Sequence, residues 1–229
     1  MRWDLLLRIR EYVVSNEPYN QAVYRSSRRG DASTLGALTE FTTMTTNFSQ
    51  LPPDLPAPVD DGAASHLEGS SLPDLTLGAT DGSTVDLASL VGKHVIYIYP
   101  MTGRPGVPLP DGWDGIPGAR GCTPQSCAFR DHHAELKARN MEVFGLSAQT
   151  TDYQQEVHER LHLPFQLLSD SGLMLKSLLK LPTFNVAGME LYKRITLITN
   201  NRKLLKVFYP VFPPDRSADD VLNWLRKDA

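Results

Sequence analysis

The chain has 229 residues, of which 41% are hydrophobic and 21% are charged, as in an ordinary globular protein. Its net charge of -3 gives no electrostatic reason to expect nucleic acid or an anionic membrane as a partner. No apolar run approaches the roughly 18 residues that a membrane span needs, and two cysteines do not make a disulfide scaffold. We therefore expect a cytoplasmic protein of a reducing compartment, with organellar targeting by the N-terminal segment left open.

The N-terminal segment, residues 1–71, is expected to be an extension or arm, largely without stable structure. Residues 1–43 mix arginines with acidic residues, which is not typical of a mitochondrial transit peptide. Met44 is a plausible true start. From there to residue 71 the chain is rich in Pro, Asp, Gly and Ser, as in a linker. The globular domain is therefore expected to span residues 72–229.

The first half of this domain contains a hairpin, a buried strand and a long loop. Asp81-Gly82 is a hairpin turn signal between short apolar stretches. Val95–Tyr99 is a run of β-branched and aromatic residues, typical of a strand that is buried on both faces. Residues 101–121 then form a Gly- and Pro-rich loop insertion, in which Trp113 is expected to be an anchor. Loops of this length are usually functional or disordered.

In the second half of the domain, predicted helices and strands alternate. A capping box of Thr151 and Gln154 is expected to open a helix that ends at Leu161. The other predicted elements are a helix from Pro124 through Leu136, strands at Val143–Ser147 and Phe165–Leu168, a helix at Leu173–Leu179, a hairpin with strands at Ile195–Ile198 and Leu204–Phe208, and a last helix from Ser217. This order predicts an α/β fold with a mixed sheet.

Both cysteines lie in the stretch Gly121-Cys122-Thr123-Pro124-Gln125-Ser126-Cys127. Pro124 suits the first turn of a helix, where its missing N–H group is not needed, so Cys122 is expected at the helix N-terminus. Unpaired backbone N–H groups and the positive end of the helix dipole favour a thiolate at that position. Cys122 is therefore a candidate nucleophile.

The five-residue spacing of the cysteines indicates a redox switch. In an intact helix their Cα atoms would lie roughly 8–9 Å apart, whereas a disulfide needs about 6.8 Å or less. Cys122 and Cys127 can therefore bond only if the first turn unwinds. Two unrelated core cysteines or a static surface disulfide are the alternatives. A zinc site with His132 and His133 would lack the usual Cys-x2-Cys pair.

From Leu72 onward the chain resembles the peroxiredoxins, in particular the peroxiredoxin Q or bacterioferritin-comigratory-protein type. The resemblance rests on four stretches, which are Gly121–Asp131, Tyr99-Pro100, Arg194–Ile198 and Val221–Leu225. It implies a thioredoxin-like fold, with a mixed central sheet flanked by helices. It also implies an antioxidant thiol-dependent peroxidase that reduces hydrogen peroxide and organic hydroperoxides without metal, haem, flavin or other cofactor.

The resemblance also implies roles for individual residues. By motif match Cys122 is the peroxidatic cysteine, whose sulfenic acid is resolved as an intramolecular disulfide by Cys127. Arg194 matches the arginine that lies against the peroxidatic sulfur. The implied reductant is thioredoxin or a similar dithiol, and both a monomer and a dimer are compatible with the family.

The chain departs from the family in the loop before Cys122. The family usually has Pro-x-x-x-Thr-x-x-Cys, whose Thr hydroxyl binds the peroxide, but here Ala119 occupies the place of the Thr. The simplest alternative is that Pro100 and Thr102 are the Pro and Thr of the motif and are followed by an insertion. This assignment requires the loop to return close to its start. Thr123 is the alternative hydroxyl donor.

Two other functions fit the same fold, because one fold carries several chemistries. A thiol–disulfide oxidoreductase is one, although it usually has a Cys-x2-Cys pair that this chain lacks. A redox sensor without efficient peroxide turnover is the other. In a sensor, the long loop and the N-terminal arm would bind the partner that receives the signal.

Overall fold

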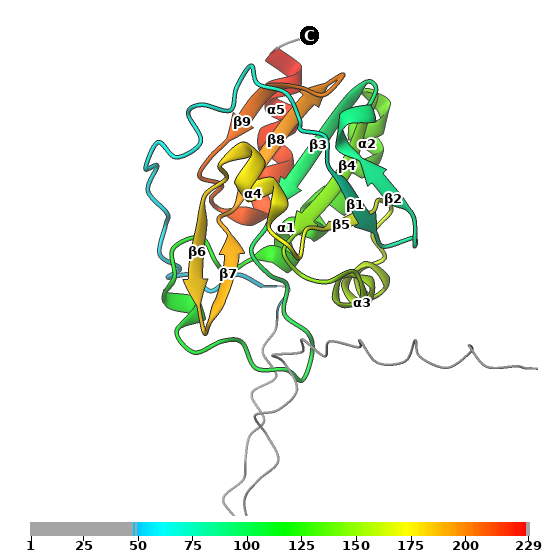
Figure 1. Ribbon diagram of the computed structural model, residues 1–229. Coiled ribbons are helices and arrows are strands. Elements are labelled where there is room, and N and C mark those ends of the chain that lie inside the picture. The colour runs from blue at the N-terminus through cyan, green and yellow to red at the C-terminus, as the bar shows by residue number, and fades with distance from the viewer. Residues whose placement is uncertain (1–47, 49, 228–229) are drawn as a thin grey trace, which may run out of the picture. The chain divides into compact units, whose positions relative to one another are not determined.

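The computed structural model of the protein describes Phe48 and residues 50–227 (Figure 1). The expectations for residues 1–43 and for Met44 as the start lie outside these residues. Within the described part of the chain, no helix is both long and apolar enough to cross a membrane.

A seven-stranded mixed sheet forms the centre of the domain, in the order β2-β1-β5-β4-β3-β8-β9 (Figure 1). The strands β3, β4 and β5 are parallel, whereas β8 is antiparallel to both β3 and β9. All residues of β3 after the first are buried, which confirms the predicted doubly buried strand. The bounds are β1 (Thr76–Ala79), β2 (Thr84–Asp86), β3 (Lys93–Ile98), β4 (Met141–Ser147), β5 (Leu167–Ser169), β8 (Ile195–Asn200) and β9 (Lys203–Phe208).

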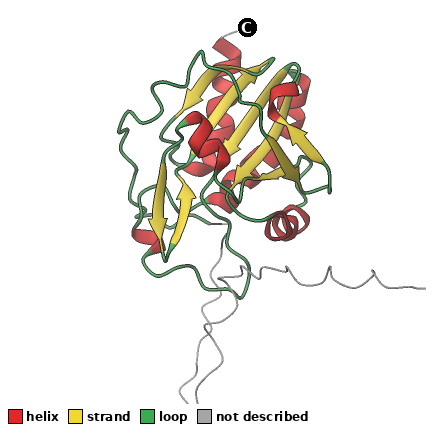
Figure 2. Ribbon diagram, in the orientation of Figure 1, coloured by secondary structure: helices red, strands yellow, loops and turns green. Residues whose placement is uncertain are grey.

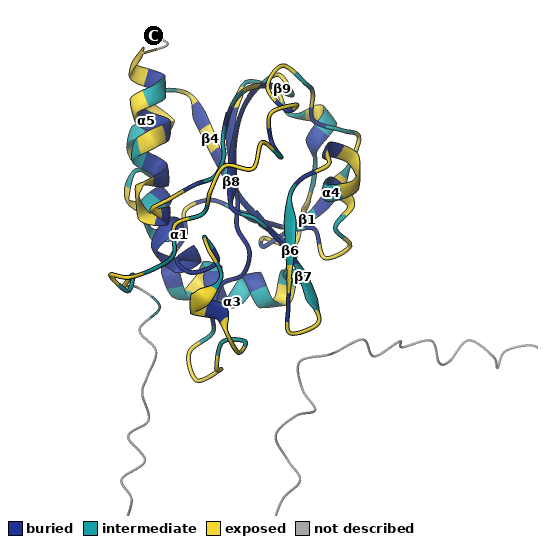
Figure 3. Ribbon diagram, turned by 90° about the vertical axis from the view of Figure 1, so that its left-hand side faces the viewer, coloured by how far each residue is buried: buried dark blue, intermediate teal, exposed yellow. Residues whose placement is uncertain are grey.

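Helices cover both faces of the sheet (Figures 2 and 3). On one face lie α1 (Cys122–Asp131), α2 (His133–Ala138), α3 (Thr151–Leu161) and α5 (Ser217–Lys227), which share a core with side chains such as Val95 and Tyr97. On the other face lies α4 (Met174–Leu179), over a second core that includes Ile96 and Ile98. Alternate residues of β3 thus face opposite cores, as the period of a strand requires. The predicted α/β fold with a flanked mixed sheet is confirmed.

Two expectations were wrong in detail. The predicted cysteine helix is two helices, because His132 leaves helical geometry with φ −95° and ψ 4°. The capping box at the start of α3 does not form, since the N-cap is Thr150. The Gln154 side chain is instead buried and donates from Nε2 to Ser147 Oγ and to the Leu168 carbonyl, both at 2.9 Å. It ties α3 to the sheet, a role that only the tertiary structure creates.

A second, two-stranded sheet, which no sequence signal predicted, is formed by β6 (Thr183–Val186) and β7 (Met189–Tyr192). These strands are joined by the turn Ala187-Gly188, in which both residues have positive φ. Three single 3-10 turns complete the described elements, namely η1 (Leu87–Ser89), η2 (Trp113–Gly115) and η3 (Pro214–Arg216).

Residues 50–63, here called the arm, contain no helix or strand but contact the domain. The Asp61 carboxylate accepts from Lys193 Nζ at 2.7 Å and from the Tyr209 hydroxyl at 2.9 Å. These two donors lower the pKa of Asp61 to about 2. Leu67, beyond the arm, is buried in the same core as Leu72. The domain boundary at residue 72 stays a prediction, but the residues just before it pack against the domain.

Candidate active site

Cys122 is the first residue of α1, as expected, and is 3% exposed. Its position depends on Gly121, the N-cap, which has φ +102° in the left-handed region that glycine favours. A Cβ atom at Gly121 would also overlap the ring of Pro214 in η3. Both cysteines are free thiols on an intact helix, and Cys127 is half-buried. The structure is therefore the reduced, helical form of the predicted switch.

Arg194 lies against the sulfur of Cys122. Its Nη2 donates to Cys122 Sγ at 3.2 Å, although the two residues are far apart in the sequence. The sheet brings them together, because Arg194 directly precedes β8 and Ile195 pairs with Ile98 at the end of β3. The loop and helix that carry Cys122 start from this same end of β3.

A chain of buried polar side chains fixes the Arg194 guanidinium. Nη1 donates to Gln125 Oε1, and Gln125 Nε2 in turn donates to Ser217 Oγ at 3.2 Å. The Ser217 hydroxyl also lies 3.1 Å from Thr196 Oγ1. Nη2 donates in addition to the carbonyls of residues 119 and 120, both at 3.1 Å. The cation thus joins the loop, α1 and α5, while its buried Nε has no partner among the described residues.

The surroundings of Cys127 are different. Burial raises the pKa of the Cys127 thiol, and the charge of Asp131 acts in the same direction, while nearby Arg130 and Arg160 oppose it. Cys127 also packs at the edge of the core that contains Phe129. In the helical form it is therefore a thiol partly shielded from water.

Residues 101–121, here called the active-site loop, return to their own start. Met101 and Ala119 belong to one apolar cluster, together with Trp113 of η2. Trp113 is buried and its ring centroid lies 6.1 Å from that of Phe184 in β6. Trp113 thus anchors the active-site loop, as predicted, by packing against the β6–β7 hairpin.

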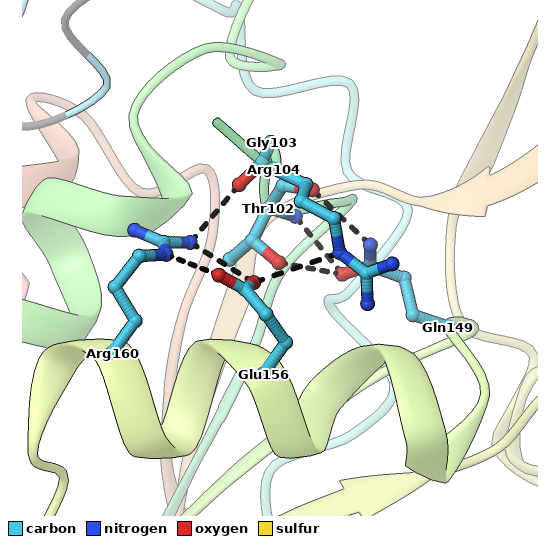
Figure 4. Close-up of polar contacts among 6 residues, drawn as sticks. All are labelled: Thr102, Gly103, Arg104, Gln149, Glu156 and Arg160. Carbon is cyan, nitrogen blue, oxygen red and sulfur yellow. Dashed lines mark hydrogen bonds and ion pairs between the residues drawn. The ribbon is translucent and has the colours of Figure 1, made fainter. Parts of the chain in front are cut away.

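The two candidate hydroxyl groups differ in their bonding. The Thr102 hydroxyl donates to Gln149 Oε1 at 3.0 Å, and Gln149 Nε2 returns a bond to the Thr102 carbonyl at 3.2 Å (Figure 4). This hydroxyl is therefore already paired. Thr123, in the first turn of α1, is buried, and within the described part of the chain its hydroxyl makes no hydrogen bond. At the position of the family's threonine, the Ala119 carbonyl oxygen accepts from Cys122 Sγ at 3.6 Å.

Charged side chains of α3 hold the start of the active-site loop (Figure 4). Arg160 Nη2 donates to the Gly103 carbonyl at 3.1 Å, and its Nε donates to Glu156 Oε1 at 2.6 Å. Arg104 lies on the other side of Glu156, with Nε 3.9 Å from Oε2. The sequence marked Ser217 only as the start of the last helix and gave no sign of the contacts of Glu156 and Arg160, whereas Gln125 lies within the cysteine motif. Among the described residues, no group of three or more potential metal ligands occurs.

Comparisons with known proteins identify the family. The Redoxin family model matches residues 67–222. The chloroplastic peroxiredoxin Q of Populus jackii is 30% identical over 161 residues, which cover 69% of this chain and 68% of that protein. This chain belongs to the redoxin family, in its peroxiredoxin Q branch. Its activity is that of a peroxiredoxin, a thiol-dependent peroxidase.

Further relatives are fungal and bacterial. Peroxiredoxin bcp1 of Schizosaccharomyces pombe is 33% identical over 113 residues, covering 48% of this chain and 50% of that protein. Among solved structures, peroxidoxin BcpB from Mycobacterium tuberculosis matches with a TM-score of 0.57 and 24% identity, covering 72% of this chain and 99% of that chain. The thioredoxin-like fold expected from the sequence is thereby confirmed.

Proposed function

We propose that Cys122 is the peroxidatic cysteine of this peroxiredoxin, that Cys127 resolves it, and that Arg194 activates it. The observation that carries the proposal is the contact of 3.2 Å between Arg194 Nη2 and Cys122 Sγ at the start of α1. A buried guanidinium beside a helix N-terminus stabilises a thiolate, which is the nucleophilic form of cysteine.

In the first step the Cys122 thiolate attacks one oxygen of the hydroperoxide. An S–O bond forms, the O–O bond breaks, and the leaving oxygen takes up a proton, so that the products are a sulfenic acid and water or an alcohol. Negative charge develops on the leaving oxygen and needs donors fixed beforehand. Arg194 is fixed by Gln125 and keeps its Nε without a partner among the described residues, which supports its role as such a donor.

In our proposal the Thr123 hydroxyl is the second hydrogen-bond donor of this step, beside the Arg194 guanidinium. The Thr102 hydroxyl already donates to Gln149 Oε1, as does its backbone N–H. We therefore assign Thr102 the role of positioning the start of the active-site loop. Thr123 follows Cys122 directly in the first helical turn. Its hydroxyl would then take the place of the family's threonine hydroxyl, where this chain has Ala119.

In the second step the first turn of α1 unwinds. The Cys127 sulfur attacks the sulfenic sulfur, an S–S bond forms, and the sulfenic oxygen leaves as water. A dithiol then reduces the disulfide by exchange, and we propose thioredoxin or a similar protein as that reductant. The end of a helix is where local opening costs least.

The cellular location follows from the same chemistry. Free cysteines that cycle through a disulfide need a reducing compartment, and we propose the cytoplasm. The alternative is an organelle, since peroxiredoxin Q of Populus jackii and of Suaeda salsa are named chloroplastic proteins. A monomer and a dimer both remain compatible with the proposal.

Intact-mass analysis with thiol titration tests these assignments after one equivalent of hydrogen peroxide. The wild-type chain should rapidly lose both thiols and form an internal disulfide. Cys122→Ser should not react, and Cys127→Ser should stop at the sulfenic acid after one turnover. A Cys127→Ser variant that matches the wild-type steady-state rate would exclude Cys127 as the resolving residue. Oxidation without turnover by a dithiol protein would indicate the redox sensor.

A further inference from the structure

Leu51 of the arm packs against the residue that precedes the reactive cysteine. A Cβ atom built on Gly121 would lie 2.7 Å from Leu51 Cδ2 and would also overlap the Pro214 ring. Gly121 is the N-cap of α1, so unwinding of the first turn must move its backbone. Leu51 and Pro214 are therefore both packed against the peptide that has to move before Cys122 can reach Cys127.

Phe48, which precedes the arm, and Pro58 of the arm also contact the active-site loop. The Phe48 ring centroid lies 5.7 Å from the guanidinium carbon of Arg120, and a Cβ atom on Gly103 would overlap this ring. Pro58 Cγ would lie 3.3 Å from a Cβ atom on Gly118. Both ends of the loop thus rest against residues that precede the domain predicted from the sequence.

Behind these contacts the arm is loosely packed. A cavity of about 360 Å³ lies beside it, lined mainly by residues 57–59 of the arm, 116–118 of the loop and 209–211 after β9. Val59 is 83% exposed. The arm is anchored again at Asp61, through its contacts with Lys193 and Tyr209. The arm is therefore attached to the domain at Asp61 independently of its contacts around Leu51.

We propose that Leu51, supported by Phe48, is a positioning residue that holds the first turn of α1 in its helical form. It would thereby set the rate at which the sulfenic acid of Cys122 is resolved by Cys127. This inference rests on the proposed function, because it concerns the second step of that cycle.

In this proposal the contacts of Leu51 affect the competition between two reactions of the sulfenic acid, over-oxidation and disulfide formation. While the turn is helical, a second hydroperoxide can transfer one oxygen to the sulfur, giving a sulfinic acid and releasing water or an alcohol. Once the turn has unwound, Cys127 forms the disulfide and water leaves. Contacts that are made only in the helical form slow the second route and leave more time for the first.

The test compares the full chain carrying Leu51→Ala with the full chain carrying Leu55→Ala, the same change at another half-buried leucine of the arm. In single turnovers with hydrogen peroxide, the measurement is the ratio of the disulfide-formation rate to the thiol-oxidation rate. Leu51→Ala should raise this ratio about fivefold, as expected for losing part of a leucine's apolar contact. Phe48→Ala should raise it by less, and Leu55→Ala should leave it unchanged.

Over-oxidation gives an independent readout, since intact mass distinguishes the sulfinic acid from the disulfide. The peroxide concentration that over-oxidises half of the chains should rise for Leu51→Ala by the same factor as the ratio. An unchanged ratio in Leu51→Ala, or an equal rise in Leu55→Ala, would overturn the inference. A wild-type chain that forms no Cys122–Cys127 disulfide would instead contradict the proposed function, so the two failures are distinguishable.

Discussion

The two cysteines lie on one helix but in opposite kinds of surroundings. Cys122 is buried, and its sulfur accepts a hydrogen bond from an arginine that is itself fixed by Gln125. Cys127 is half-buried at the edge of the apolar core, where burial raises its thiol pKa. The difference shows what each step of the cycle requires. In the proposed cycle, the sulfur that reacts first is held in place by polar contacts, whereas the second reacts only after the first turn of α1 has unwound.

The same comparison explains why the switch can be reversible. In the proposed cycle, unwinding the first turn would break the contact between Arg194 and Cys122, whereas the core around Ile98 contains neither cysteine. A local change of this kind costs far less than unfolding the domain.

Removing the cation at Cys122 should have the largest effect. In Arg194→Ala the sulfur loses its charged donor, so we expect the rate of thiol oxidation by hydrogen peroxide to fall about 100- to 1000-fold. Arg194→Lys should recover only part of this loss, since an ammonium group cannot also bond Gln125 and the two carbonyls. Stopped-flow kinetics measures the rate, and a loss of less than about threefold in Arg194→Ala would contradict the role of Arg194.

Removing the side chain that fixes the Arg194 guanidinium, without removing the guanidinium, should slow the oxidation of Cys122 less than Arg194→Ala does. Gln125→Ala leaves Arg194 in place but removes the acceptor of its Nη1, so we expect about a tenfold slower oxidation of Cys122. The reactivity of Cys122 towards iodoacetamide should fall with it. Gln155→Ala is the matched control, because Gln155 lies half-buried on α3 and bonds only Glu159 among the described residues. Equal rates in both variants would show that Gln125 is not needed to fix the guanidinium.

The burial of Cys127 should affect the pH dependence of its alkylation. Burial favours the neutral thiol, so the pKa of Cys127 is raised and less thiolate is present at a given pH. In the reduced Cys122→Ser variant, alkylation of Cys127 should therefore require a higher pH than alkylation of the same chain in denaturant. The midpoints of the two alkylation curves are the measurement. Coincident midpoints would mean that the core does not shield this thiol.

Much of the fold was predictable because its signals are local. The buried run at Val95–Tyr99, the turn at Asp81-Gly82 and the charge pattern of the last helix each specify an element within a few residues. The hairpin β6–β7 was missed, because its residues alternate only weakly between buried and exposed positions. Its turn depends on a positive φ at Ala187, which the sequence does not suggest.

The candidate site was predictable to a different extent. The position of Cys122 at a helix start follows from Gly121 and Pro124 alone. The partners of Arg194 do not, because Ser217 comes from the far end of the chain and reaches Gln125 only through the packing of α5 against α1. Likewise Gln149, which pairs with Thr102, is set by the position of the loop after β4. Long-range polar contacts have no pattern in a single sequence.

Removing the Thr102 hydroxyl should have the smallest effect on the rate of Cys122 oxidation. Thr102→Val keeps the shape of the side chain but removes the hydroxyl that bonds Gln149 Oε1, while the backbone bonds between the two residues remain. We expect the free energy of unfolding to fall by about 1 kcal/mol and the rate of Cys122 oxidation to change by less than about twofold. Thr123→Val, the matched substitution in the first turn of α1, should slow oxidation about tenfold as the proposed hydroxyl donor. A larger rate loss in Thr102→Val than in Thr123→Val would assign the peroxide-binding hydroxyl to the start of the loop instead of the helix.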